Sequence, residues 1–202
     1  MKKFLQNEQI NTNWQNQNDY IKTPFYVACQ NGHLEVVKFL LKDERIDINK
    51  ADKYDQTPFY CACCFGHIEI AKLLLNDRRI DINKASNNHG QTSFNVACFE
   101  GRIEVVKLLL NDDRVDVNKA SNYGRTPFCI ACFNGHIEIV KYLLESGREI
   151  DINKKDNGGK TGLDRAREKG KTNIVQLIES FQRNPNEIRA NLRKELAIGK
   201  FF

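Results

Sequence analysis

The chain repeats itself with a fixed period. A threonine opens a similar phrase five times, at steps of 34 or 35 residues, as Thr23, Thr57, Thr92, Thr126 and Thr161. A repeat of this length makes each segment one supersecondary unit that must pack on its neighbours to bury its apolar face. The period therefore predicts one elongated array, although a length of 202 residues by itself would suit one or two globular domains.

The second unit shows what each segment should form. Thr57 is placed to cap a short helix with Pro58 in its first turn, where the missing N–H of proline costs nothing. Gly66 should end that helix in a left-handed conformation. A second helix is expected over residues 68–75, which are too apolar to stand alone. The segment 79–84 alternates apolar and Asp or Asn residues and predicts a loop with β character that leads to the next unit.

These phrases carry a family resemblance. Thr-Pro-Phe-x-x-Ala followed by Gly-His, as in Thr57 to His67, resembles the ankyrin repeat family. The resemblance implies an all-α repeat solenoid of stacked helix-turn-helix-hairpin units with short β-hairpin tips. It also implies altered hydrogen bonds, because the histidine that the family usually carries three residues after the threonine is replaced by Tyr26, Tyr60, Asn95 and Cys129 in the first four units.

The two ends differ from the central units. Residues 1–17 should form an N-terminal segment with part of a half repeat, residues 18–182 the array, and residues 183–202 a C-terminal capping helix and tail. The fifth unit resembles a C-terminal capping repeat, because Arg165 and Arg167 stand where other units have apolar residues. The final helix has two interpretations: it docks on the fifth unit through Ile188, Leu192 and Leu196, or it is exposed and engages a partner.

Composition narrows the function classes. The 31 Lys and Arg residues are interleaved with 26 Asp and Glu residues, so we expect no nucleic-acid track. No apolar run approaches the roughly 18 residues of a membrane helix, and the first residues lack the apolar centre of a signal peptide. An odd number of cysteines, seven, agrees with a reducing compartment. We expect a cytoplasmic protein, with the nucleus as the second location, that does not bind membranes.

The residues that could carry chemistry have structural explanations. Four cysteines occupy a slot where the family has a small buried alanine, and they should lie too far apart to share a disulfide or a zinc ion: Cys29, Cys63, Cys98 and Cys132. Gly158-Gly159-Lys160-Thr161 lacks the first glycine of a phosphate-binding loop, because residue 154 is Lys154. We therefore predict no catalytic residues, metal or cofactor. Cys64 and Cys129 are the exceptions. Their positions, counted from the repeated threonines, should face the inner surface of the array, so an enzymatic hypothesis that uses them stays open.

The resemblance also implies where a partner binds. Ankyrin repeats use the concave side, formed by the hairpin tips and the exposed face of each first helix. Counting from each threonine gives the predicted partner-binding residues Tyr20, Tyr54, Gln56, Cys64, Phe65, His89, Gln91, Phe99, Glu100, Tyr123, Arg125, Phe133 and Asn134.

Aromatic residues stand out in this set. Phe65, Phe99 and Phe133 occupy slots that the scaffold does not need to fill with aromatics, and large aromatics often carry interface energy. The alternative is that the rings pack between adjacent units. We expect a non-enzymatic scaffold that binds a protein partner of unknown identity, as a monomer. The second hypothesis is a self-associating array, or homodimer, that pairs through the C-terminal helix or the N-terminal edge.

Overall fold

The computed structural model describes residues 11–198, which consist of helices joined by turns. They divide after Ser93 into two compact blocks, here called the N-terminal block and the C-terminal block. Residues 1–10 of the predicted N-terminal segment lie outside the described residues. The helices are α2 (Pro24–Gln30), α3 (Leu34–Leu40), α4 (Pro58–Phe65), α5 (Ile68–Leu75), α6 (Ser93–Phe99), α7 (Ile103–Leu110), α8 (Pro127–Asn134), α9 (Ile137–Glu145), α10 (Gly162–Glu168), α11 (Thr172–Arg183) and α12 (Pro185–Ile198).

The predicted cap and stop residues set the length of the first helix in each pair. The Thr57 hydroxyl accepts a hydrogen bond from the Tyr60 N–H at 3.1 Å, and the same bond recurs from the Cys129 N–H to Thr126. Gly66 and Gly135 then end α4 and α8 in the left-handed conformation, with φ of 78° and 86°. These caps satisfy backbone groups that a short helix would otherwise leave unpaired.

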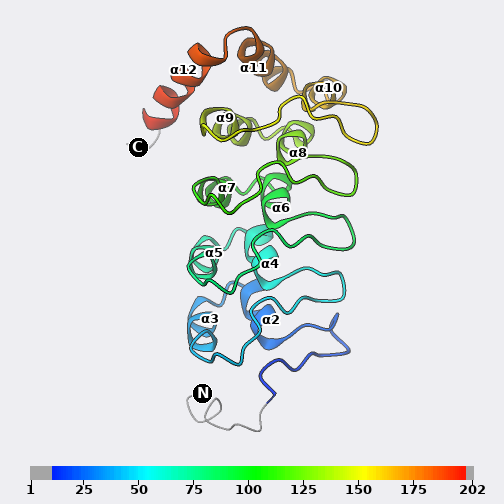
Figure 1. The fold of residues 1–202 in the computed structure, drawn as a ribbon, viewed down its shortest axis with the longest axis vertical. Coiled ribbons are helices and arrows are strands. Elements are labelled where there is room, and N and C mark those ends of the chain that lie inside the picture. The colour runs from blue at the N-terminus through cyan, green and yellow to red at the C-terminus, as the bar shows by residue number, and fades with distance from the viewer. Residues whose placement is uncertain (1–10, 199–202) are drawn as a thin grey trace. The chain divides into compact units, whose positions relative to one another are not determined.

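Within each block, first helices pack on first helices and second helices on second helices (Figure 1). The contacts α2–α4 and α3–α5 build the N-terminal block, and α8–α10 and α7–α9 build the C-terminal block. The core between the layers holds fully buried side chains such as Phe59, Leu74, Phe128 and Leu143. An apolar helix of eight residues is stable here because its neighbours cover it. The predicted all-α repeat solenoid class is confirmed.

The long loops end in turns rather than in the predicted β-hairpins. In the loop before α4, the Asp52 N–H bonds to the Gln56 carbonyl, and the Asp52 side chain accepts from the N–H groups of Tyr54 and Gln56. A carboxylate that binds its own loop in this way favours a tight turn over a strand ladder. The described residues contain no strand, only an isolated bridge between Asn16 and Lys22.

The C-terminal helix α12 docks on its own block. It packs on α9 and α11, and Leu192 and Leu196 are buried there. Arg189 Nε donates to the Leu144 carbonyl oxygen at 3.1 Å, at the end of α9, where carbonyls lack partners within the helix. Lys141 on α9 pairs with Glu195 at 2.6 Å. Of the two interpretations of this helix, the docked one describes the structure, but the helix packs on α9 of the fourth unit as well as on α11 of the fifth, and Ile188 is only half-buried.

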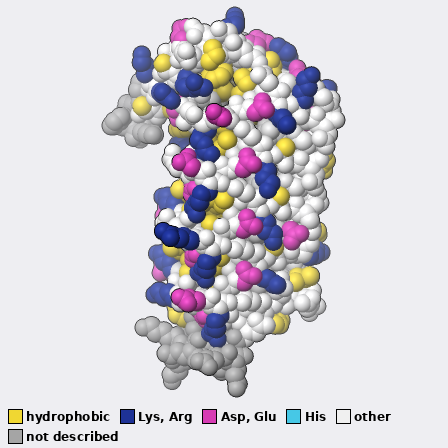
Figure 2. All heavy atoms as spheres, viewed as in Figure 1, with side chains coloured by type: hydrophobic (Ala, Val, Ile, Leu, Met, Phe, Trp, Pro, Cys, Tyr) yellow, Lys and Arg dark blue, Asp and Glu magenta, His cyan; other side chains and the backbone are white. Residues whose placement is uncertain are grey.

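Surface charges are mixed in sign. Pairs such as Glu35–Lys38 and Glu69–Lys72 form on the second helices, with N–O distances of 2.7 and 2.9 Å. On the face drawn in Figure 2, basic side chains alternate with acidic ones. None of the helices within residues 11–198 combines the length and the apolar character needed to cross a bilayer.

Candidate functional site: the loop tips and first-helix ends

The tyrosines at the loop tips have fixed backbones and exposed rings. The Tyr54 carbonyl accepts the N–H of Asn87 in the next loop at 2.9 Å, and its ring is 37% exposed. In the C-terminal block, the Tyr123 carbonyl accepts the N–H of Asn157 at 3.0 Å while its side chain is 54% exposed. Each loop thus anchors the backbone of the loop before it, so the rings are presented to solvent from an ordered backbone.

Tyr20 sits in a turn that is unusual for its sequence. Tyr20 and Ile21 have φ of 52° and 64°, and the Lys22 N–H bonds to the Asp19 carbonyl, as in a turn that Asn-Gly usually forms. The Lys53 N–H bonds to the Tyr20 carbonyl at 3.0 Å. Such strained backbone persists only where its surroundings hold it, and it is found most often at functional sites.

Lysines stack against this tyrosine pair. The Tyr20 and Tyr54 ring centroids lie 6.0 Å apart, and Lys53 Nζ lies 4.0 Å from the first centroid and 4.9 Å from the second. The structure therefore brings two predicted site residues together in the N-terminal block and adds Lys53, which the frame count missed. The available indication was that Lys53 directly precedes Tyr54 in the sequence.

The three phenylalanines lie near the ends of the first helices. Phe65 and Phe99 are 47% and 45% exposed, while Phe133 is half-buried under Arg125 and Lys169. The Phe65 ring stacks on His67 with centroids 6.2 Å apart. Burial between adjacent units, the alternative for these rings, does not describe Phe65 or Phe99.

The remaining predicted site residues are mostly polar and partly buried. Gln91 Oε1 accepts from the Tyr60 hydroxyl at 3.4 Å, and Asn134 Nδ2 donates to the Ile130 carbonyl at 3.0 Å. Gln56 closes the Asp52 turn through its backbone. Glu100 is exposed, whereas Cys64, His89 and Arg125 are half-buried.

The slot that lacks the usual histidine is filled by side chains that reach the following loop. The Tyr26 hydroxyl donates to Asp52 Oδ2 at 3.0 Å and accepts from Cys61 Sγ at 2.9 Å. Burial raises the pKa of Tyr26 far above its usual range. Asn95 Nδ2 donates to the Lys119 carbonyl at 3.0 Å. The predicted alteration of the hydrogen bonds is therefore confirmed, and Tyr26, Tyr60 and Asn95 still join their helices to the next loop.

Helix pairs with threonine caps, glycine stops and anchored loops are the geometry of one known family. A model of that family, described as ankyrin repeats (3 copies), matches residues 1–86, 44–121 and 94–188. The chain belongs to the ankyrin repeat family. Ankyrin repeats are generally modules for protein–protein interaction, typically without enzymatic activity. Among curated proteins, no significant match is found. The count of five repeats stays a prediction from the threonine spacing.

Two polar clamps join successive ankyrin repeats. Asn49 Nδ2 donates to the Arg79 carbonyl at 2.6 Å, and Asn49 Oδ1 accepts from the Asp81 N–H at 2.8 Å. His67 Nε2 lies 2.9 Å from the Gln30 carbonyl, and its ring occupies the space beside Gly32, where a Cβ would lie 2.7 Å from the ring. Sequence reasoning identified the recurrence of these residues but not the bonds. The available indication was that a polar side chain, Asn or His, recurs at a fixed distance from the repeated threonine.

The two cysteines left open by the sequence differ in the structure. Cys129 is buried, so the prediction that it points to an accessible inner surface is wrong. Burial raises the pKa of its thiol to about 11, which disfavours the reactive thiolate. Cys64 is half-buried. Within the part of the chain that the structure describes, no three His, Cys, Asp or Glu side chains lie together as a metal site.

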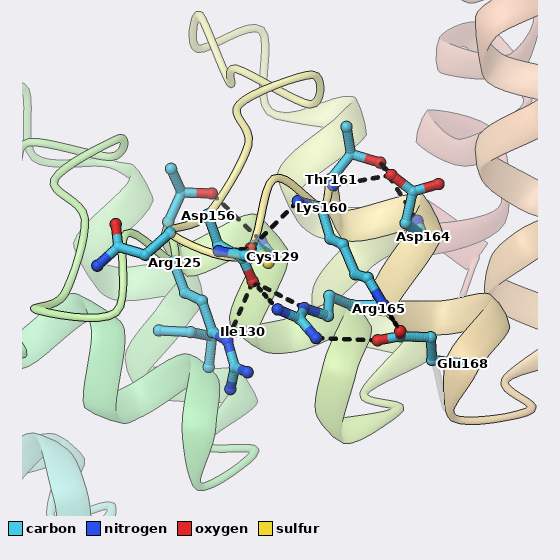
Figure 3. A network of polar contacts seen from close by, with 12 residues as sticks. Arg125, Cys129, Ile130, Asp156, Lys160, Thr161, Asp164, Arg165 and Glu168 are labelled. Carbon is cyan, nitrogen blue, oxygen red and sulfur yellow. Dashed lines mark hydrogen bonds and ion pairs between the residues drawn. The ribbon is translucent and has the colours of Figure 1, made fainter.

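An ionic network lies at the last two loop tips (Figure 3). Asp156 Oδ2 accepts from Arg165 Nε at 2.7 Å and Nη2 at 2.6 Å, while the N–H groups of Gly158 and Lys160 bind Oδ1. Burial acts to raise the pKa of Asp156, but these hydrogen bonds outweigh it and hold the pKa below its usual range. Arg165 was predicted to form a polar outer end, and instead it ties the last repeat to this loop.

Proposed function

We propose that this ankyrin array is a non-enzymatic scaffold that binds a protein partner on its concave surface. The observation that carries the proposal is the set of large aromatic side chains that lie exposed at predicted positions, on backbones held by hydrogen bonds: Tyr20, Tyr54, Phe65, Phe99 and Tyr123. Exposed aromatics contribute strongly to interfaces because they bury much area and lose little conformational entropy.

The free cysteines suit a reducing compartment. All seven are unpaired thiols, and the cytoplasm keeps such thiols reduced. A cytoplasmic location therefore belongs to the same proposal. Lys53 and Arg125, which stack on the tyrosines, add cationic groups to the proposed surface.

The test is affinity capture with the wild-type chain and with the triple variant Tyr54→Ala/Phe99→Ala/Tyr123→Ala, followed by mass spectrometry. We expect the triple variant to lose the captured partner and to keep the wild-type melting temperature, because these rings are exposed. Trp14→Ala/Tyr142→Ala is the matched control, since it removes aromatic side chains outside the proposed surface. A large loss of stability in the triple variant, or equal loss of capture in the control, would contradict the proposal.

A second candidate function is self-association. It is favoured by an apolar groove of about 620 Å³ on α3 and α5, lined by Val36, Phe39 and Leu73. Burial of Leu192 and Leu196 within their own block weighs against pairing through α12. Light scattering on the full chain and on residues 1–182 distinguishes the two modes of pairing. A dimer mass for both proteins would favour pairing through the N-terminal edge, and a dimer mass for the full chain alone would favour pairing through α12.

A further inference from the structure

The charges at the last two loop tips of the C-terminal block do not balance. Two carboxylates, Asp156 and Glu168, face four cations: Arg125, Lys160, Arg165 and Lys169. Asp156 is almost fully buried and is occupied by Arg165 and two backbone N–H groups. Glu168 accepts from Arg165 Nη1 at 2.9 Å and also pairs with Lys160. The carboxylate oxygens are therefore engaged mainly by Arg165 and Lys160, with a longer contact from Arg125 Nε to Asp156 Oδ2 (Figure 3).

Arg125 and Lys169 are the two surplus cations. Arg125 hydrogen-bonds to Asp156 only through Nε, at 3.4 Å, and within residues 11–198 its Nη1 and Nη2 atoms donate no hydrogen bond. The Lys169 side chain forms no ion pair with any described residue. A guanidinium edge with two unused donors matches the two oxygens of a carboxylate.

Phe133 holds both cations in place. The Arg125 guanidinium carbon lies 4.4 Å from the Phe133 ring centroid, and Lys169 Nζ lies 4.7 Å from it. Contact with an aromatic ring orients a cation without using its N–H donors. Arg125 is also 5.9 Å from the exposed Tyr123 ring. The donors are thus positioned before any ligand arrives, which lowers the entropic cost of binding.

The surrounding sequence carries the same excess of charge. Residues 154–171 contain seven Lys or Arg and three Asp or Glu, whereas the whole chain has a formal net charge of +5. Most of the net positive charge of the protein therefore lies in this segment. Such a local field draws an acidic segment toward the site and raises its association rate.

We propose that Arg125, Lys169 and Phe133 form a docking site for an acidic segment of a protein partner. A partner carboxylate accepts hydrogen bonds from Arg125 Nη1 and Nη2 and from Lys169 Nζ, beside the Phe133 ring. This site rests on the proposed function, because it names the chemistry of a partner on the same surface. Figure 3 shows the carboxylate of Asp156 next to Arg125 and its ion pair with Arg165.

The test is fluorescence anisotropy with a labelled hexaglutamate peptide on the full chain at low salt. We expect saturable binding that weakens at least about tenfold in Arg125→Gln/Lys169→Gln, since it loses charge-assisted hydrogen bonds. Lys50→Gln/Lys194→Gln is the matched control: it removes the same charge from exposed lysines that lie outside residues 154–171 and form no ion pair with described residues. That control should change the affinity less than about twofold.

Three results would overturn the inference. They are the absence of saturable binding up to about 1 mM peptide, equal weakening in the two double variants, and equally tight binding of an oligothymidylate of the same charge. The last result would indicate a general polyanion surface. Phe133→Leu keeps an apolar side chain and should weaken the peptide by several-fold, because only the ring orients both cations.

Partner capture by the triple variant Tyr54→Ala/Phe99→Ala/Tyr123→Ala distinguishes failure of the acidic-segment inference from failure of the proposed function. Partner capture that depends on Tyr54, Phe99 and Tyr123, together with no peptide binding, overturns the acidic-segment inference alone. Loss of stability in the aromatic variant overturns the proposed surface, whatever the peptide does. Circular dichroism on each variant verifies that the helices are intact.

Discussion

His67 Nε2 lies 2.9 Å from the carbonyl oxygen of Gln30, the last residue of the first helix in the preceding repeat. The ring also fills the space beside Gly32, whose φ of 73° favours a residue without a Cβ. One side chain thus satisfies a helix-end carbonyl and fixes the spacing of two repeats. His33, at the same frame position in the first repeat, is exposed instead.

The His67→Ala substitution should reduce the free energy of unfolding by about 1–2 kcal/mol, because it leaves a carbonyl unpaired and opens space at the contact between repeats. Chemical denaturation of the full chain measures the change. His33→Ala is the control and should cost less than about 0.5 kcal/mol. Equal losses in the two variants would show that the inter-repeat bond contributes nothing.

Acid should weaken the link between Asp156 and Arg165. The pKa of Asp156 is depressed in the folded protein, so its ionised form adds stability at pH values above the unfolded pKa of about 4, and this stability is lost as the pH falls through the folded pKa. Asp156→Asn should cost about 2–3 kcal/mol at pH 7, since Arg165 is left without its carboxylate. Denaturation at a series of pH values from 7 to 3 checks both points. The difference between wild type and Asp156→Asn should shrink at the acid end, and a constant difference would contradict the assignment.

Native cysteines should differ in reactivity with a thiol reagent. We expect Cys64 to be modified first, because it is half-buried whereas the other six cysteines are buried. Burial raises the pKa of Cys129 to about 11 and that of Cys61 to about 12, so both thiols stay almost entirely protonated between pH 7 and 9 and should be modified slowly. Mass spectrometry of the intact protein with time gives the order, and Cys64→Ser should remove the fast phase. Fast modification of Cys129 would restore the enzymatic hypothesis.

The C-terminal helix should contribute to the stability of its block. Leu192→Ala removes a buried side chain between α12 and α9 and should cost about 2–3 kcal/mol. Lys194→Ala, on an exposed position of the same helix, is the control and should cost less than about 0.5 kcal/mol. Thermal unfolding followed by circular dichroism measures both. A melting temperature unchanged by Leu192→Ala would mean that α12 is not held on α9.

Local sequence determined the array and the helix ends. Thr57, Pro58 and Gly66 act within one or two helical turns, so their spacing predicts α4 and its neighbours from the sequence alone. The same frame count identified the exposed tyrosines at the loop tips and the exposed Phe65 and Phe99 at the ends of first helices. It failed for the β-hairpin tips, where Asp52 satisfies the loop internally.

Contacts between repeats were decided by the tertiary structure. The burial of Cys129, the Asn49 clamp and the engagement of Asp156 by Arg165 all depend on side chains from different parts of a repeat or from consecutive repeats. A single sequence does not show which side chains bond to each other when they lie about 30 positions apart. The period therefore determined that this protein is built of stacked helix pairs with aromatic residues at fixed positions of the repeat. Only the packed structure decided which donors are already engaged, and that Arg125 Nη1 and Nη2 and Lys169 Nζ form no hydrogen bond with a described residue, because pairing depends on distances that a repeat frame does not contain.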